Sequence, residues 1–291
     1  MLTSGLGFCR LVTQTPGVGP VLSDAPSVDP QGEVRPQRSS SMGWWKRFPP
    51  AVFSIAGLLL LWQWAADLDV LAGSLPSATA TFAEFWSQMQ DPESWIAVWD
   101  TTKTAAIGFV IAVAIAVPMG IALGLSRFTF LSTRFTLNFL RVIPGIVVIP
   151  IASLVLGPTL QMGIFVVAWP IIFVVAVQTS YGVRDADPVL IETLKCYKQG
   201  LWGQIRYARL PAAAPLIAYS IRIAVVIAFL AAVTAGIIGG SPGMGRELMY
   251  SQLNGQPSAT FAIVLQLGIL GMLVSLFVEW LQPKVIFWVP S

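Results

Sequence analysis

A cationic stretch between two strongly apolar regions contains the residues whose chemistry is most informative. Residues 192–215 include Lys195, Lys198, Arg206 and Arg209. Because charged side chains inside a bilayer are costly, this stretch must lie at a membrane surface. The excess of lysine and arginine predicts the cytoplasmic surface.

Apolar residues in the same stretch have helical spacing on both sides of two glycines. Leu190 and Leu194 share one face of a first short helix, and Leu201 and Ile205 begin a second, with a bend near Gly200. Two short helices that present apolar side chains to a cytosolic partner are one interpretation. A loop helix that only anchors at the lipid headgroups is the other.

Three more charged residues lie within or beside predicted spans, where a charge indicates function. Arg222 follows Pro211 by eleven positions, or about 16 Å along a helix, and this depth requires a partner or a wet cavity. Glu279 is a candidate partner. Arg141 lies within about ten residues of the predicted inner face, so its side chain either takes part in transport or snorkels to the headgroups.

The composition excludes soluble enzymes and nucleic-acid-binding proteins. Hydrophobic residues make up 55% of the 291 residues and charged residues 11%, against roughly 25% charged in a typical soluble domain. The net charge of +3 is small and dispersed, so no nucleic acid is expected as a partner. The chain has no histidine, and its acids lie mostly in loops, so no catalytic or metal site is predicted.

Six segments are apolar and long enough to cross a bilayer. They are residues 49–66, 99–125, 132–156, 160–183, 211–238 and 259–281. Acidic residues dominate the connection between the first two, which predicts that both termini are cytoplasmic. A helix that begins near Ser77 and ends at Gln90 is expected to lie flat on the outer surface, and residues 236–256 are expected to form an outer loop. The predicted fold is an all-α membrane protein in the plasma or inner cell membrane.

The first 41 residues form a polar tail rich in proline, glycine and serine, which is predicted to be disordered. Met42 opens a conventional membrane start, so a misassigned start codon and a regulatory tail are both open. Residues 42–291 form the transmembrane domain, with a cytoplasmic loop at residues 187–210 inside it.

The cytoplasmic loop resembles the coupling loop of ABC-importer permeases. Their pattern places a glutamate nineteen positions before the proline of a Leu-Pro pair, and Glu192, Leu210 and Pro211 fit it. Thr193 and Leu194 replace the two alanines that usually follow the glutamate. Lys198 stands where the family usually has glycine, so Gly200 is expected to supply the bend instead.

Further motifs resemble the permeases that import nitrate, sulfonates, taurine and bicarbonate. They are Leu75-Pro76-Ser77, Gly124-Leu125-Ser126-Arg127, Arg141-Val142-Ile143-Pro144 with Ile149-Pro150, and Ser241-Pro242-Gly243-Met244-Gly245. Gly236 departs from the pattern, because these permeases often have a glutamate there. A different substrate or no functional change would account for this departure.

The resemblance implies a type I importer permease with six transmembrane helices and coupling helices between spans four and five. Its implied partners are ABC ATPase subunits, an extracytoplasmic solute-binding protein and a second permease subunit in the lipid bilayer, with a homodimer expected and a heterodimer left open. Because the chain has no phosphate-binding loop, ATP and magnesium would bind to the ATPase and this chain would carry no cofactor. The cargo would be a small anion such as a sulfonate, nitrate or a carboxylate.

The resemblance also implies a set of ATPase-docking residues, which is Glu192, Thr193, Leu194, Tyr197, Gly200, Leu201, Trp202, Leu210 and Pro211. The candidate translocation-path set comes instead from the charges and the proline within or beside the predicted spans, and it is Arg141, Pro144 and Arg222. A carboxylate that caps a helix start is the alternative role for Glu192. An ATP-independent secondary transporter or channel is the alternative function, although neither inverted repeats nor midplane acids are apparent.

Overall fold

A computed structural model describes residues 48–68 and 75–285. The chain divides between Gly57 and Leu58 into two units, and the described part of the first is the beginning of α1 (Phe48–Asp67). The predicted tail, residues 1–41, lies outside the described residues. The helices of the second unit are α2 (Ala78–Gln90), α3 (Pro92–Leu125), α4 (Arg127–Val142), α5 (Gly145–Leu156), α6 (Leu160–Arg184), α7 (Pro188–Cys196), α8 (Leu201–Gln204), η2 (Ile205–Arg209), α9 (Leu210–Gly239), α10 (Met244–Leu253) and α11 (Pro257–Val285).

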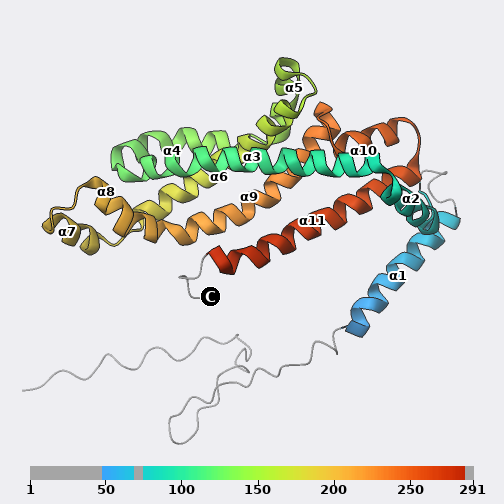
Figure 1. Cartoon of the computed structure of the whole chain (residues 1–291), viewed down its shortest axis with the longest axis horizontal. Helices are drawn as coiled ribbons and strands as arrows, with labels where there is room; N and C mark the ends of the chain where they lie inside the picture. Colours follow the sequence, from blue (N-terminus) through green and yellow to red (C-terminus); the bar gives the residue numbers. More distant parts are fainter. Residues whose placement is uncertain (1–47, 69–74, 286–291) are drawn as a thin grey trace, which may run out of the picture. The chain divides into compact units, whose positions relative to one another are not determined.

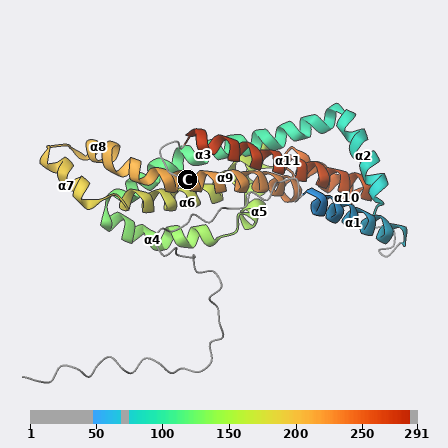
Figure 2. The same cartoon turned by 90° about the horizontal axis from the view of Figure 1, so that it is seen from below.

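Rows of small residues hold α3 and α9 close to α6, and the three helices lie side by side (Figures 1 and 2). On α3 every fourth residue of the contact is small and buried, and it meets branched side chains of α6. A Cβ atom added at Gly120 would lie 2.5 Å from Thr179 Cβ, and one at Gly124 would lie 2.7 Å from Val183 Cβ. Such ridges pack helices closely where lipid offers no hydrophobic driving force. The row on α3 is Gly108, Ala112, Ala116, Gly120 and Gly124.

Helix α9 also has a row of small buried residues. Ser220, Ala224, Ala228 and Ala232 are buried at intervals of four residues. At the other end of the contact, a Cβ atom on Gly182 would lie 2.8 Å from Ala213 Cα. The buried core therefore consists mainly of alanine, glycine and valine.

Four helical segments in the described part of the chain are long and apolar enough to cross a membrane. They are Pro92–Leu125, Leu160–Arg184, Leu201–Leu253 and Pro257–Trp280, and the bent pair of α4 and α5 raises the number to five if it counts as one span. The all-α fold is confirmed. The total of six spans stays a prediction, because it depends on α1.

The third predicted span, residues 132–156, is wrong as a single helix. The chain forms α4 and α5, whose axes differ by 82° across a short break. Ile143 is extended (φ −64°, ψ 114°), and Pro144 follows it at the start of α5. Proline disfavours the helical conformation of the residue before it and has no N–H for a hydrogen bond, so the helix ends there.

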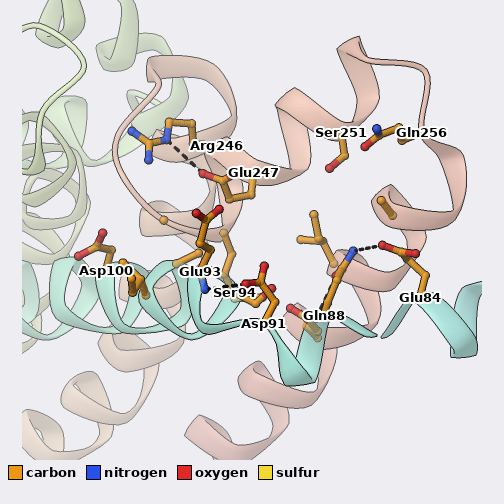
Figure 3. Close-up of a pocket in the computed structure, with 17 residues that line it drawn as sticks. Glu84, Gln88, Asp91, Glu93, Ser94, Asp100, Arg246, Glu247, Ser251 and Gln256 are labelled. Atoms are coloured by element: carbon orange, nitrogen blue, oxygen red, sulfur yellow. Dashed lines mark hydrogen bonds and ion pairs between the residues drawn. The ribbon is translucent and has the colours of Figure 1, made fainter. Parts of the chain in front are cut away.

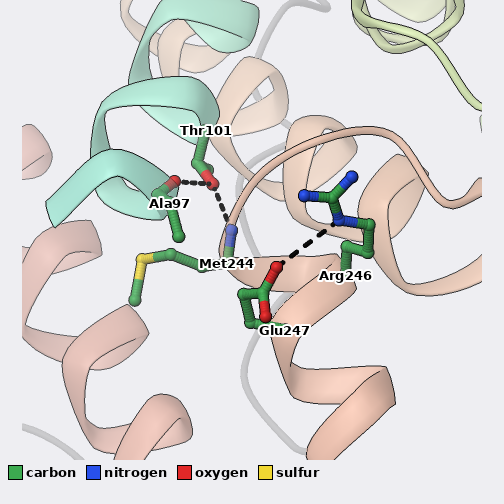
Figure 4. Close-up of polar contacts among 5 residues, drawn as sticks. All are labelled: Ala97, Thr101, Met244, Arg246 and Glu247. Carbon is green, nitrogen blue, oxygen red and sulfur yellow. Dashed lines mark hydrogen bonds and ion pairs between the residues drawn. The ribbon is translucent and has the colours of Figure 1, made fainter. Parts of the chain in front are cut away.

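The predicted outer loop, residues 236–256, is also mostly helical. Helix α9 continues to Gly239, and α10 covers Met244–Leu253. The Met244 N–H donates to Thr101 Oγ1 at 2.8 Å, which fixes the start of α10 on α3 (Figure 4). A Cβ atom at Gly236 would lie 2.9 Å from Gly245 Cα. This close approach of α9 and α10 leaves no room for a side chain at position 236.

Helix α2 agrees with the sequence prediction over Ser77 to Gln90. Ser77 caps it, since its hydroxyl accepts from Ala80 N–H at 3.2 Å. The helix packs against α11, and Gln266 Nε2 on α11 donates to Gln88 Oε1 at 3.0 Å. Its position on the outer membrane surface stays a prediction.

Substitution of Gly120 by valine is expected to destabilise the second unit, because the added atoms would collide with Thr179 and with the Ala176 carbonyl. Overpacking of this kind typically costs about 1–3 kcal/mol. The melting temperature in mild detergent, measured by size-exclusion chromatography of a fluorescent fusion, should fall by several degrees. Gly268→Val on α11 is the matched control, since no atom lies within 4 Å of its added Cβ. Equal melting temperatures for the two variants would contradict the close contact of α3 with α6.

Candidate functional site

Residues 187–210, named here the docking segment, form α7, α8 and a π-helical turn, η2. Asp187 caps α7 by accepting from Val189 N–H at 2.8 Å, and Pro188 follows at the first position of the helix. The segment contacts the spans through η2, which touches α6 and continues into α9. The two predicted helices are therefore present, but the second is continuous with the fifth predicted span.

Large apolar side chains of the docking segment point away from the protein. Tyr197 is 76% exposed and Trp202 is 73% exposed. Val189, Leu201 and Tyr207 are also exposed. An exposed apolar group of this size, rimmed by lysines and arginines, is typical of a protein-binding surface.

The bend between α7 and α8 occurs at Lys198 and not at Gly200. Lys198 has a left-handed backbone (φ 56°), whereas Gly200 is extended. Lys198 N–H donates to the Lys195 carbonyl and Gln199 N–H to the Leu194 carbonyl, each at 2.9 Å. These two bonds form a Schellman motif, which normally places glycine at the left-handed position. The prediction that Gly200 supplies the bend is thus wrong, because the local hydrogen bonds hold a lysine in the glycine conformation.

Glu192 lies in the middle of α7 and is exposed. Asp187 caps the helix start, so capping does not explain Glu192. Thr193 shares its exposed side, and Leu194 is half-buried. Leu210 and Pro211 begin α9 at the far side of η2, and both are exposed.

Arg222 and Glu279 form the ion pair that their charges suggested. Arg222 Nη2 lies 3.0 Å from Glu279 Oε1, and the side chains are 45% and 56% exposed. The pair joins α9 to α11 beside a groove of about 630 Å³ whose walls come from α3, α9 and α11. The lining is almost entirely apolar, with Arg222 as its charged member.

Arg141 and Pro144 lie elsewhere. Arg141 is exposed in the last turn of α4, and Pro144 precedes α5. Helix α4 packs on α3 and α6, whereas Arg222 faces α11. The three residues predicted for one path are therefore not brought together in this chain, and the lining of the groove includes neither Arg141 nor Pro144.

A second pocket, of about 490 Å³, lies between α2, α3, α10 and α11 (Figure 3). Its ionisable lining is acidic except for Arg246, whose Nε lies 3.4 Å from Glu247 Oε1 (Figure 4). The acids are Glu84, Asp91, Glu93, Asp100 and Glu247. The acidic excess near α2 is visible in the sequence, but the pocket is not, since α10 follows α2 by about 150 positions and no local pattern joins them.

Curated relatives of the chain are transport permeases. It is 29% identical over 248 residues to the putative aliphatic sulfonates transport permease protein SsuC of Bacillus subtilis, which covers 84% of this chain and 88% of that protein. It is 25% identical over 249 residues to the nitrate import permease protein NrtB of Synechocystis sp., covering 81% and 88%. Identity to the bicarbonate transport system permease protein CmpB of Synechococcus elongatus is 26% over 241 residues, covering 78% and 86%.

A solved structure supports the fold. A chain of the MetNI methionine ABC transporter, in a study of its inward-facing conformations, matches with a TM-score of 0.58 and 19% identity, and the match covers 67% of this chain and 99% of that chain. Residues 112–287, more than half of the sequence, match the family described as binding-protein-dependent transport system inner membrane component. The chain belongs to this family and is a permease subunit of an ABC transporter, not an enzyme.

Proposed function

We propose that this permease forms the membrane path of an importer for a small anion and is driven by a separate ATPase that docks on residues 187–210. The observation that carries the proposal is the exposed apolar face of the docking segment, on a helix that continues without a break into α9. The ATPase would bind ATP and magnesium, and this chain would hold neither.

The docking surface combines apolar and charged groups in a way that suits a protein partner. Tyr197 and Trp202 supply large aromatic anchors of the kind that dominate interfaces. Glu192 lies on α7, five positions before Tyr197, and its exposed carboxylate can orient a cationic group of the partner. Three further members of the predicted docking set, Leu201, Leu210 and Pro211, extend this surface toward α9.

Movement of the docking segment has a direct route into the membrane. Helix α8 and η2 continue into α9, whose residue Ala213 lies against Gly182 of α6. Because the helices are packed without slack, a push on α8 displaces α9 and α6 together. Rigid-body rocking of the spans between two states follows from this connection, and it does not require this chain to bind nucleotide.

An anion is the cargo that the relatives support, since their names give aliphatic sulfonates, nitrate and bicarbonate. We expect a solute-binding protein to deliver it at the end of the molecule formed by α2 and α10. The lysines and arginines of the docking segment favour a cytoplasmic position for the opposite end. Both termini then lie in the cytoplasm, and a second copy of the chain completes the path.

Replacement of Glu192 by arginine is expected to leave membrane insertion unchanged, because the side chain is exposed, and to uncouple ATP hydrolysis from uptake. Uptake into cells should fall by at least about tenfold, which corresponds to 1.4 kcal/mol in an equilibrium. Co-purification of the ATPase from mild detergent is the second measurement.

Glu93→Arg is the control for the co-purification alone, because it makes the same charge change in the first turn of α3, in the acidic pocket and outside the docking segment. It should retain the ATPase. Normal uptake by the Glu192 variant would remove the case for its role in docking.

If the ion pair between Arg222 of α9 and Glu279 of α11 holds these helices together, its two charges can be swapped without loss of stability. Arg222→Glu and Glu279→Arg alone each place like charges within ion-pair distance and should lower the melting temperature. The double variant restores opposite charges and should recover most of the loss. If the double variant is stable but does not transport, Arg222 contributes to the path as well. If neither single variant is destabilised, the pair has no structural role.

A further inference from the structure

Three arginines of α4 form a ladder along one side of the helix. Arg127, Arg134 and Arg141 are seven positions apart, which places each about 10 Å beyond the last and nearly on one line. All three side chains are exposed. Asn138 lies on the same side of the helix between Arg134 and Arg141, because it follows Arg134 by four positions and precedes Arg141 by three.

The ladder extends into the depth of the spans. Near its beginning α4 meets the end of α6, where the rings of Phe130 and Tyr181 are 5.6 Å apart. Just past the end of α4, a Cβ atom on Gly145 would lie 3.8 Å from Pro170 of α6. Helix α4 therefore runs antiparallel along α6, which is long and apolar enough to cross the membrane. Arg141, in the last turn of α4 and four positions before Gly145, lies beside the middle part of α6.

Among the residues that the structure describes, none of the three arginine side chains has a hydrogen bond or an ion pair. Arg141 could stabilise the carbonyl end of α4, but Arg134 lies in the middle of the helix and has no such role. An arginine at this depth needs water, an anion or a carboxylate. Contact of these three guanidinium groups with lipid acyl chains would be energetically costly.

A different face of α4 is suited to lipid. Phe128 and Phe135 are exposed and lie about 100° around the helix from the arginines, and Phe139 lies near them. Phe130, on the side that packs toward α6, is buried. The ladder thus occupies the border between the packed face and the apolar face, where a water-filled crevice can reach it.

We propose that the arginine ladder of α4 lines the cytoplasmic half of the anion path, with Arg134 as a binding residue between Arg141 and Arg127. This inference rests on the proposed import of an anion. A guanidinium group can bind two oxygens of a carboxylate or sulfonate at once. Several sites about 10 Å apart let an anion leave one arginine for the next without a single tight trap.

The test uses a cysteine at Asn138, which leaves all three arginines in place. In the full chain with Cys9→Ser and Cys196→Ser, inside-out membrane vesicles are treated with the anionic reagent 2-sulfonatoethyl methanethiosulfonate or with its cationic trimethylammonium analogue. The rate at which each reagent modifies the protein cysteine is divided by its rate of reaction with free cysteine, which corrects for the different intrinsic reactivities of the two reagents. The expected ratio of anionic to cationic rates is at least about tenfold at Asn138→Cys. Adding Arg134→Gln should reduce it several-fold, and Arg134→Lys should retain it.

Phe135→Cys is the matched control, next to Arg134 in sequence but on the apolar face, and it should react slowly with both reagents. Three results would overturn the proposal: no reaction at Asn138→Cys, a ratio near one, or a ratio that Arg134→Gln does not change. The first would be expected if carboxylates of a second copy cover the ladder. If Asn138→Cys is lost from the membrane, Leu131→Cys serves as the reporter with the same expectations, because Leu131 is exposed and lies between Arg127 and Arg134 at the same spacing.

The labelling requires no ATP, so its outcome is independent of the proposed ATPase docking. Co-purification of the ATPase with the same cysteine-substituted chain tests that docking separately. A selective labelling ratio without a co-purified ATPase would support the ladder proposal and contradict the proposed ATPase docking. A co-purified ATPase together with a labelling ratio near one would support the docking and contradict the ladder proposal.

Discussion

The fit of branched side chains on α6 between small residues of α3 and α9 is the contact on which the other features depend. Inside a bilayer, helices gain little from leaving lipid for one another, so their association relies on close packing. Glycine and alanine at every fourth position of α3 provide that approach. A packed set of this kind moves as a body, which is why a push on the end of α9 can reach α6.

Charges in this chain are placed by the same constraint. The apolar core has no room for them, so most ionisable groups of the described residues lie at the docking segment, in the pocket between α2, α3, α10 and α11, or on the open faces of α4 and α9. Arg222 has a carboxylate partner on α11, whereas the arginines of α4 have none among the described residues. This difference is the reason why we propose a transport role for the arginines of α4 and test Arg222 first as a structural residue.

Much of this could be predicted from the sequence, because membrane insertion imposes long apolar runs and a cationic cytoplasmic side. The Arg222–Glu279 pair was predictable from charge alone. The break at Pro144 was not, since proline bends many membrane helices without ending them, and Pro118 and Pro170 of this chain lie inside continuous helices. The left-handed Lys198 and the helix α10 were missed because hydrogen bonds and long-range contacts override the local preference for glycine or loop.

The most direct test of the account is purification of the tagged chain from its native membrane in mild detergent, with its partners identified by mass. The account predicts that an ABC ATPase subunit co-purifies. It also predicts that vesicles reconstituted with the complex take up solute only when ATP is present on the side of the membrane that carries the ATPase. A chain that purifies alone and moves solute without ATP would contradict it and would favour a channel or secondary transporter.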